Sequence, residues 1–272
     1  MISLSKVIPV KCILGEGLFV KNQYIAWVDI KAKKIYLSHN NIIKTYDVTF
    51  IPTAIIDIDD SKISIVSNIG VVNFYYRKQK IKITTDFSNI CKSTFRSNDA
   101  GFYGKHLLFG FMHKQQPLQY KGIIYSLRNE ELCIIDEDIN IPNSFIEIEA
   151  GKVIISDSGG GLIWLYSFDK DGSFLKKDLW HKMPDGICPD GGCLINDLIF
   201  LSVWDDSSIT VFNKQGTLIK KIKIPILRPT NCKFDKIKKQ LWVTSASEGI
   251  ETMSFNHGIN NGDTLIYDLD FI

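Results

Sequence analysis

The chain consists of short apolar runs separated by polar turns, and apolar residues rarely recur at helical spacing. The runs are rich in Ile, Val, Tyr, Phe and Trp, and they are bounded by Gly, Asn, Asp and Lys. Continuous or alternating runs of about four to eight such residues are typical of β-strands. We therefore expect nearly the whole chain to be strand.

One unit recurs along the chain: a very apolar strand, a polar turn, a second, amphipathic strand, and then more variable sequence. A period of roughly 40 to 50 residues is typical of β-propeller blades, and radial packing of blades leaves only short, protected sheet edges. A β-sandwich or barrel is the structural alternative, but neither predicts six evenly spaced copies. The sequence predicts one all-β domain, residues 1–272, folded as a six-bladed β-propeller. The apolar strands are marked by Ile25, Ile63, Leu107, Val153, Ile199 and Leu241, at spacings of 38, 44, 46, 46 and 42 residues.

Charge and composition exclude several classes of function. Lys plus Arg number 32 against 30 for Asp plus Glu, and the lysines are scattered, so no basic surface for nucleic acid or for an anionic membrane is indicated. Lys6 and Lys11 interrupt the apolar sequence at the N-terminus, and no run of about 18 apolar residues occurs. We expect a soluble, cytoplasmic protein with a small-molecule partner, and the sequence leaves open whether it is a monomer or a dimer.

The cysteine and histidine residues match no familiar site. The six cysteines contain no Cys-x-x-Cys pair, the five histidines form no HExxH motif, and no phosphate-binding GxxxxGK[ST] loop is present. In a chain of this size that is not secreted, we expect free and mostly buried thiols.

Polar residues share one position in several units. We expect the apolar marker strands to be the first strands of the blades and to line the central channel. The loops entering them should then open at one channel mouth, where residues at equal distances before each marker converge. Four oxygen-bearing residues lie nine or ten positions before a marker: Glu16, Asn98, Asn143 and Asp190. Arg96 lies eleven positions before its marker, and Asn231, ten before Leu241, is a further candidate.

The same count separates two copies of Pro-Asp-Gly in the segment MPDGICPDGG. Pro-Asp-Gly is first a turn signal, because each of its residues favours turn geometry. Asp190 shares the common offset, whereas Asp185 lies fourteen positions before its marker. We therefore assign Asp190 to the channel mouth and Asp185 to the preceding inter-blade loop.

A cluster of Glu, Asn and Asp without His or Cys suits a hard divalent cation that prefers oxygen ligands, with room left for water or substrate. The alternative is that each of these residues caps a turn or a strand, which is the commonest task of Asn and Asp in loops. The shared offset in four blades brings the cation site level with this alternative, and both remain open at this point.

At these residues the chain resembles the senescence marker protein/gluconolactonase (regucalcin-like) family of six-bladed propellers. The resemblance runs in order along nearly the whole chain, and it lies in a series of short motifs. These are LGEG then YIAWVDI, FRSND then LLFGFM, GIIYSL, PN then VIISDS, CPDGGC then LIFLSVW, and finally RPTNCKF and LWVTSA.

The resemblance implies a site and an activity. Glu16, Asn143 and Asp190 would bind one divalent cation (Ca²⁺, Mg²⁺, Mn²⁺ or Zn²⁺), and Arg96 and Asn98 would hold the substrate. The implied reaction is metal-dependent hydrolysis of a small sugar lactone, with Asp190 as the catalytic base. The chain departs from the family pattern in ways expected to change loop shape and substrate choice: Leu18 replaces Pro, Ala100 and Ser144 replace Gly, and no Glu occurs in residues 118–121.

Two other functions remain open from the sequence. The same scaffold could hydrolyse other esters or phosphotriesters, or it could be a non-catalytic propeller stabilised by a metal ion. Arg96 and Asn98 beside the three metal ligands favour an enzyme, since a purely structural ion would not need them.

Overall fold

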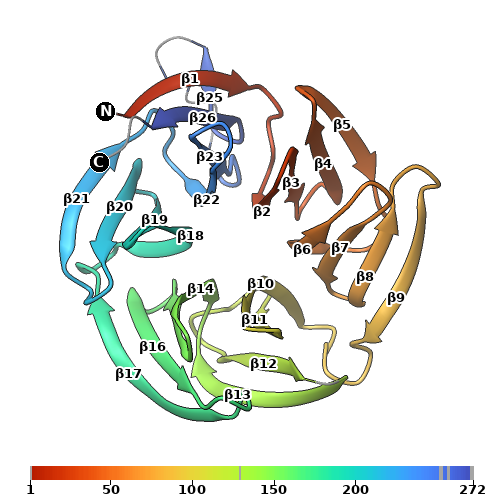
Figure 1. Cartoon of the computed structure of the whole chain (residues 1–272), viewed down its shortest axis with the longest axis vertical. Coiled ribbons are helices and arrows are strands. Elements are labelled where there is room, and N and C mark those ends of the chain that lie inside the picture. Colours follow the sequence, from red (N-terminus) through yellow and green to blue (C-terminus); the bar gives the residue numbers. More distant parts are fainter. Residues whose placement is uncertain (1, 129, 251–253, 256–257, 270–272) are drawn as a thin grey trace.

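The computed structural model describes residues 2–128, 130–250, 254–255 and 258–269. In these residues six four-stranded antiparallel sheets stand as blades around a central channel (Figure 1), and β24 (Ser254–Phe255) and β25 (Ile259–Asn260) form a short hairpin. No α-helix occurs in this part of the chain. The described residues accordingly contain no helix that could cross a membrane. The prediction of an all-β six-bladed propeller is confirmed.

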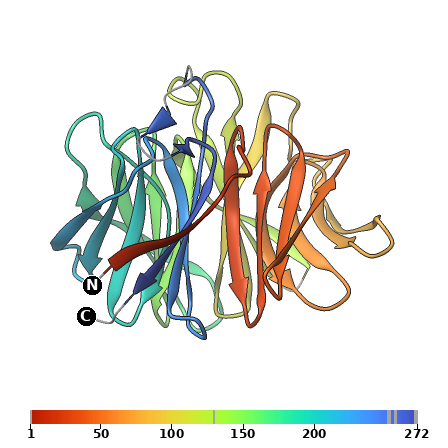
Figure 2. The same ribbon diagram turned by 90° about the horizontal axis from the view of Figure 1, so that it is seen from above.

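Each blade begins at the channel. The first strands of neighbouring blades contact one another around the axis (Figure 1), and the strands run through the depth of the ring (Figure 2). The first strands are β2 (Gly15–Lys21), β6 (Pro52–Ile58), β10 (Phe95–Tyr103), β14 (Pro142–Glu149), β18 (Cys188–Ile195) and β22 (Pro229–Asp235).

The apolar marker strands are the second strands of the blades, so the prediction that they line the channel was wrong. A second strand is hydrogen-bonded on both edges and covered on both faces by neighbouring blades, and it is therefore the most apolar strand of its blade. The first strand faces the channel and keeps polar residues. The second strands are β3 (Tyr24–Asp29), β7 (Ile63–Ser67), β11 (His106–His113), β15 (Lys152–Asp157), β19 (Leu198–Trp204) and β23 (Gln240–Ser245).

The third and fourth strands complete each blade toward the rim. The third strands are β4 (Lys34–His39), β8 (Gly70–Tyr75), β12 (Gly122–Arg128), β16 (Leu162–Phe168), β20 (Ser208–Asn213) and β26 (Thr264–Leu269). The fourth strands are β5 (Ile42–Asp47), β9 (Lys80–Asp86), β13 (Glu131–Ile139), β17 (Phe174–Lys182), β21 (Leu218–Lys223) and β1 (Ile2–Ile8).

The ring is closed by the N-terminal strand. β1 pairs antiparallel with β26, with Ile2 opposite Leu269 and Ile8 opposite Thr264, and it supplies the outer strand of the sixth blade. The first residue of β1 and the last of β26 therefore lie side by side. This pairing ties the last blade to the first through the chain that continues into β2.

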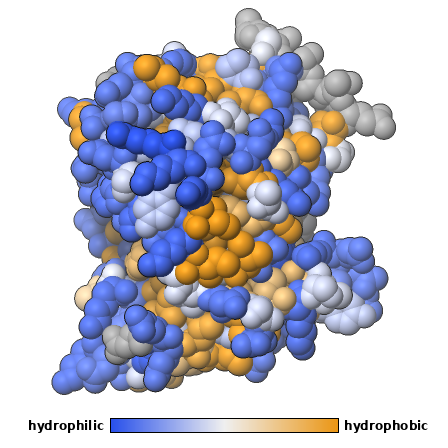
Figure 3. All heavy atoms as spheres, turned by 90° about the vertical axis from the view of Figure 1, so that its right-hand side faces the viewer, coloured by the Kyte–Doolittle hydropathy of each residue, from blue (hydrophilic) through white to orange (hydrophobic). Residues whose placement is uncertain are grey.

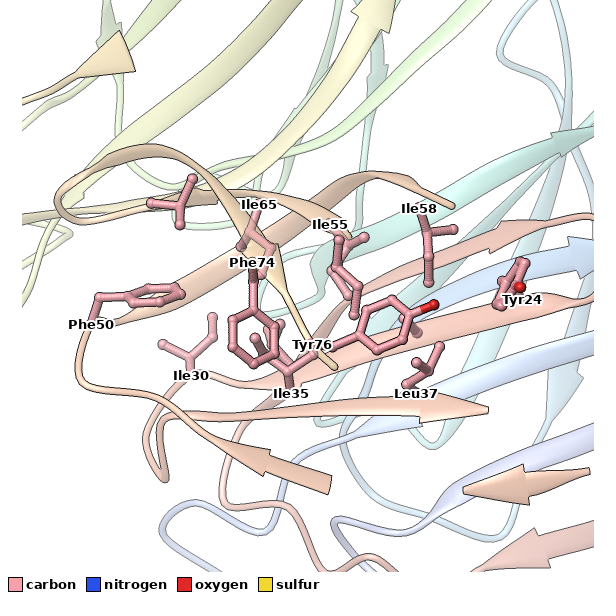
Figure 4. Packing of buried hydrophobic residues seen from close by; sticks show 14 of the residues in the cluster. Tyr24, Ile30, Ile35, Leu37, Phe50, Ile55, Ile58, Ile65, Phe74 and Tyr76 are labelled. Atoms are coloured by element: carbon pink, nitrogen blue, oxygen red, sulfur yellow. The ribbon is translucent and has the colours of Figure 1, made fainter. Parts of the chain in front are cut away.

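The core lies between blades rather than in one central mass. Figure 4 shows the interface of the first two blades, where Ile35 and Leu37 face Ile55, Ile65 and Phe74. Full burial of one such side chain contributes roughly 1.5–3 kcal/mol relative to its exposure. Similar clusters fill the other interfaces, so every blade depends on its neighbours.

The fourth strands form the outer wall and are mostly exposed. Lysines alternate there with apolar residues, as in β9, where Ile81 and Ile83 are both more than two-fifths exposed. Figure 3 shows the side of the ring where β9 lies, with an apolar area bordered by hydrophilic residues.

Candidate metal centre

The first strands themselves carry the predicted site residues. Glu16 lies on β2, Arg96 and Asn98 on β10, Asn143 on β14 and Asp190 on β18. All five line one cavity of about 390 Å³ at the end of the channel where these strands begin. The residues converge as the equal offsets predict, but they come from strands and not from the loops before them.

A β-bulge lies at this point in each of these strands. An extra residue in one strand of a pair increases the local twist and re-aims side chains. The four bulges explain why polar side chains from paired strands point into the channel at one level. The pairing register shifts between Glu16 and Phe19, between Ser97 and Ala100, between Asn143 and Ile146, and between Pro189 and Gly192.

Two of the bulges require left-handed backbone. Gly17 has φ = 58°, and a Cβ built on it would lie 2.5 Å from the carbonyl oxygen of Thr53, so only glycine fits. Ser144 has φ = 54° without being glycine, and its amide donates to Asp99 Oδ2 at 2.9 Å. Its hydroxyl donates to the carbonyl oxygen of Asp190, which joins the fourth and fifth blades beside the site.

A chain of hydrogen bonds runs across the site. Arg96 Nη1 donates to Asn98 Oδ1 at 2.5 Å, and Asn98 Nδ2 donates to Asn143 Oδ1 at 2.9 Å and to the carbonyl oxygen of Pro142 at 3.1 Å. Asn143 Nδ2 in turn donates to Ser158 Oγ at 2.9 Å. These bonds fix the orientation of both amides, so Asn143 presents its oxygen toward Asn98 and the cavity.

Buried aspartates hold the entrances of two first strands in place. Asp29, at the end of β3, accepts the amide hydrogens of Ile13 at 2.7 Å and Leu14 at 3.2 Å, just before Glu16. Asp157, at the end of β15, plays the same part for the amides of Asn140 and Ile141, at 2.9 and 3.0 Å, just before Asn143. Both carboxylates thus fix backbone that carries site residues.

The site concentrates negative charge away from water. Glu16 is 8% exposed and Asp190 is 5% exposed. Burial, together with the charge of Asp99, raises the pKa of Glu16 to about 8, although a bond from the Gly17 amide and the charge of Arg96 oppose the shift. Burial and the charges of Glu16 and Asp99 raise the pKa of Asp190 well above its usual value. Burial also raises the pKa of Asp99.

This donor set fits a hard divalent cation. Two buried carboxylates repel one another with one arginine nearby, and a cation between them would offset both the repulsion and the burial. In the described residues no group of three or more His, Cys, Asp and Glu side chains is arranged for a metal, and the amide oxygen of Asn143, which lines the same cavity, is the third oxygen ligand that this donor set offers. Glu, Asp and Asn oxygens are ligands that Ca²⁺, Mg²⁺ and Mn²⁺ accept.

The two remaining sequence candidates lie apart from this cavity. Asp185 is in the turn between β17 and β18, and its side chain is 99% exposed. Asn231, on β22, is buried beside Glu16 and bonds to that carboxylate. Its Oδ1 is buried without a hydrogen-bond partner in the described structure, and it lines a second cavity deeper in the channel, together with Asp99.

Comparison with known protein families matches residues 14–247 to the SMP-30/Gluconolactonase/LRE-like region. The chain belongs to this family. The matched span includes every candidate residue of the site. A search of curated proteins by sequence found no match.

Solved structures of similar proteins share the propeller. A calcium-binding regucalcin from Agrobacterium tumefaciens superposes with a TM-score of 0.87 at 19% identity, over 97% of this chain and 93% of that one. A luciferin-regenerating enzyme gives 0.86 at 19% identity, over 97% and 95%. A proposed gluconolactonase gives 0.75 at 12% identity, over 99% and 98%. At these identities the likeness establishes the fold.

The departures from the SMP-30/gluconolactonase pattern are explained by packing. Leu18, Ala100 and Ser144 lie on β2, β10 and β14, so the expectation that they alter loops was wrong. Leu18 is 2% exposed and packs against the cluster that contains Trp27. Ser144 replaces a residue free to adopt positive φ and gains the bond to Asp190.

Sequence reasoning missed two acidic residues of this SMP-30/gluconolactonase-type site. Asp99 follows Asn98 in the bulge of β10, but its carboxylate points away from the main cavity to the amides of Ala100 and Ser144. Glu248, in the turn after β23, lines the cavity and pairs with Lys31 at 2.8 Å. The place of Asp99 as the last residue of RSND could have drawn attention to it, whereas Glu248 lies after its marker strand, outside the offset count.

Proposed function

We propose that this protein is a metal-dependent hydrolase of small lactones. The observation that carries the proposal is the convergence of Glu16, Asn143 and Asp190 with Arg96 at the floor of one cavity. Membership of a family whose description includes gluconolactonase supports the reaction class. An ion with a purely structural role would not need an arginine beside it.

Glu16, Asn143 and Asp190 would hold the cation, which would polarise the lactone carbonyl and stabilise the negative charge that develops on its oxygen. Asp190 accepts a proton from the attacking water, because its carboxylate is buried at the cavity floor. Arg96 orients the lactone through the nitrogens that do not bond to Asn98, since its planar fork presents donors in fixed directions.

The test is hydrolysis by chelated and re-metallated protein. The protein is stripped with a chelator, dialysed, and loaded separately with Ca²⁺, Mg²⁺, Mn²⁺ or Zn²⁺, and acid release from a panel of lactones, aryl esters and phosphotriesters is followed with a pH indicator. We expect lactone hydrolysis that is lost on chelation and restored by at least one cation. Phosphotriester or ester turnover without lactone turnover would overturn the assignment, as would hydrolysis that does not depend on metal.

A further inference from the structure

The walls of the site cavity are apolar. Above the polar floor, the lining comes from the turn before β2, the end of β11, the loop that follows it, the turn before β14 and the end of β19. The apolar lining residues are Leu14, Met112, Pro117, Leu118, Ile141 and Trp204. A volume of about 390 Å³ lies within the range of roughly 300–1,000 Å³ typical of small-molecule sites.

Most polar groups of the cavity are already satisfied by the protein. Asn98 uses both sides of its amide, because Nδ2 donates to Pro142 and Asn143 and Oδ1 accepts from Arg96. Ser158 donates to the carbonyl oxygen of Pro189 at 2.6 Å and accepts from Asn143. Apart from the carboxylates of Glu16 and Asp190, the side-chain groups of the described lining that remain for a ligand body are the other nitrogens of Arg96, the thiol of Cys188 and the carboxylate of Glu248, which also pairs with Lys31.

These remaining hydrogen-bonding groups are too few for a sugar lactone. A polyhydroxylated ring carries a hydroxyl on nearly every carbon, and each one buried against Met112 or Ile141 would lose its bonds to water without replacement. An aryl or alkyl body loses no hydrogen bonds there and removes apolar wall from water.

The apolar rim is held in a fixed position. Asn140 Nδ2 donates to the carbonyl oxygens of Pro117 at 3.0 Å and Leu118 at 3.2 Å. Leu118 is 69% exposed in the protein alone, yet its backbone is fixed at the cavity mouth. An exposed leucine fixed beside a cavity offers an apolar surface that a ligand can cover at little entropic cost.

We infer that the substrates are lactones with an apolar body, such as an aryl-fused or alkyl-substituted ring, and not polyhydroxylated sugar lactones. This inference rests on the proposed function. The carbonyl faces the Glu16, Asn143 and Asp190 cluster, and the ring body lies against Leu118 and Met112. Hydrolysis joins the water oxygen to the carbonyl carbon, breaks the ring C–O bond, and delivers a proton to the leaving oxygen, giving a hydroxy acid.

The first measurement compares kcat/KM for 3,4-dihydrocoumarin and D-glucono-1,5-lactone with the metal-loaded protein, after subtraction of spontaneous hydrolysis. We expect the aryl lactone to be favoured by about two powers of ten, which is the scale on which an apolar pocket discriminates against a substrate that carries an added hydroxyl. An equal or higher value for the sugar lactone would overturn the inference and leave the proposed function standing.

Variants test which residues produce the preference for the aryl lactone. Leu118→Asn removes apolar rim, and we expect it to lower kcat/KM for dihydrocoumarin about tenfold with little change for gluconolactone. The matched control is Leu175→Asn, since Leu175 is 61% exposed on β17 at the outer wall. An equal effect of both variants on dihydrocoumarin would contradict the placement of the ring body.

Binding of a ligand that cannot be hydrolysed tests the apolar ligand class independently of the proposed lactonase activity. The ketone 2-tetralone has the shape of dihydrocoumarin but cannot be hydrolysed, and its binding is measured by titration calorimetry with myo-inositol as the polar counterpart. Binding of 2-tetralone that Leu118→Asn weakens, without turnover of any lactone, would refute the lactonase and support the apolar ligand class. Absence of 2-tetralone binding, or preference for inositol, would overturn the inference whatever the catalytic result.

Discussion

Asn98 Nδ2 lies 2.9 Å from Asn143 Oδ1, across the boundary between the third and fourth blades. Asn98, which the family resemblance assigns to the substrate, thus contacts Asn143, which it assigns to the cation. A hydrogen bond to a ligand oxygen fixes the direction of its remaining lone pair, in the manner of the outer-shell partners of metal sites.

Asn98→Ala should therefore weaken cation binding, because the amide of Asn143 would then be held only by its bond to Ser158. We expect a loss of about 10- to 100-fold in affinity, the scale found for outer-shell partners of metal ligands, measured by calorimetric titration of the stripped protein. If Asn98→Ala kept full cation affinity and raised only KM, Asn98 would act on the substrate alone.

Arg96→Ala should abolish lactone turnover while the cation still binds. The guanidinium cannot be a cation ligand, and its charge opposes a neighbouring cation, so its removal should leave cation affinity unchanged or higher. Turnover and cation titration are measured on the same preparation. Loss of cation binding by a variant with an unchanged circular dichroism spectrum would show that Arg96 organises the ligands.

Stability without metal should fall as the pH rises. The pKa of Glu16 is about 8 in the folded protein against an ordinary value of 4.5, so between these values the native state holds a proton that the unfolded state has released. The contribution of Glu16 to the free energy of unfolding is then greatest below pH 4.5 and decreases as the pH rises to about 8. The total decrease is at most about 1.4 kcal/mol for each unit by which the two pKa values differ.

The measurement is thermal unfolding of stripped wild type and Glu16→Gln from pH 5 to 8. The melting temperature of the variant should rise relative to that of wild type as the pH rises. Excess cation should stabilise wild type more than the variant, since an ion that binds only the native state stabilises it by mass action. Parallel pH curves and equal cation effects would mean that Glu16 belongs to no cation site.

Asp190→Asn should lower turnover by roughly two or more powers of ten, the usual scale for loss of a general base. The variant keeps a ligand oxygen and removes the charge. Asp185→Asn is the matched control, because the Asp185 side chain is 99% exposed and lies five residues earlier in the same segment. Both are assayed at saturating cation, and an inactive Asp185→Asn beside an active Asp190→Asn would reverse the assignment.

The blade period and the convergence of the site could be predicted from sequence, because each repeat places the same bulge at the same distance from an apolar strand. Ile25 and Val153 mark equivalent positions, and the bulges account for offsets of nine and ten residues. The strand order within a blade could not be predicted in this way. Segments such as CPDGG contain Pro, Asp and Gly, which are typical of turns, yet they form part of β18 because β19 pairs with them.

Other features depend on contacts that local sequence does not encode. Glu248 reaches the cavity from a turn that has no counterpart in the repeat count. The apolar character of the cavity comes from residues of several blades, such as Leu118 and Trp204, which are unremarkable in their own segments. β1 could not be placed either, since its partner strand lies at the other end of the chain.

The pairing of β1 with β26 also determines how the molecule responds to force. Ile2 lies opposite Leu269, so the two ends leave this antiparallel pair on the same side. A pull on both ends would load the backbone hydrogen bonds in sequence, from Ile2 toward Ile8, instead of shearing all of them together. The pair that closes the ring is thus its mechanical weak point, where tension would unzip the sixth blade one bond at a time.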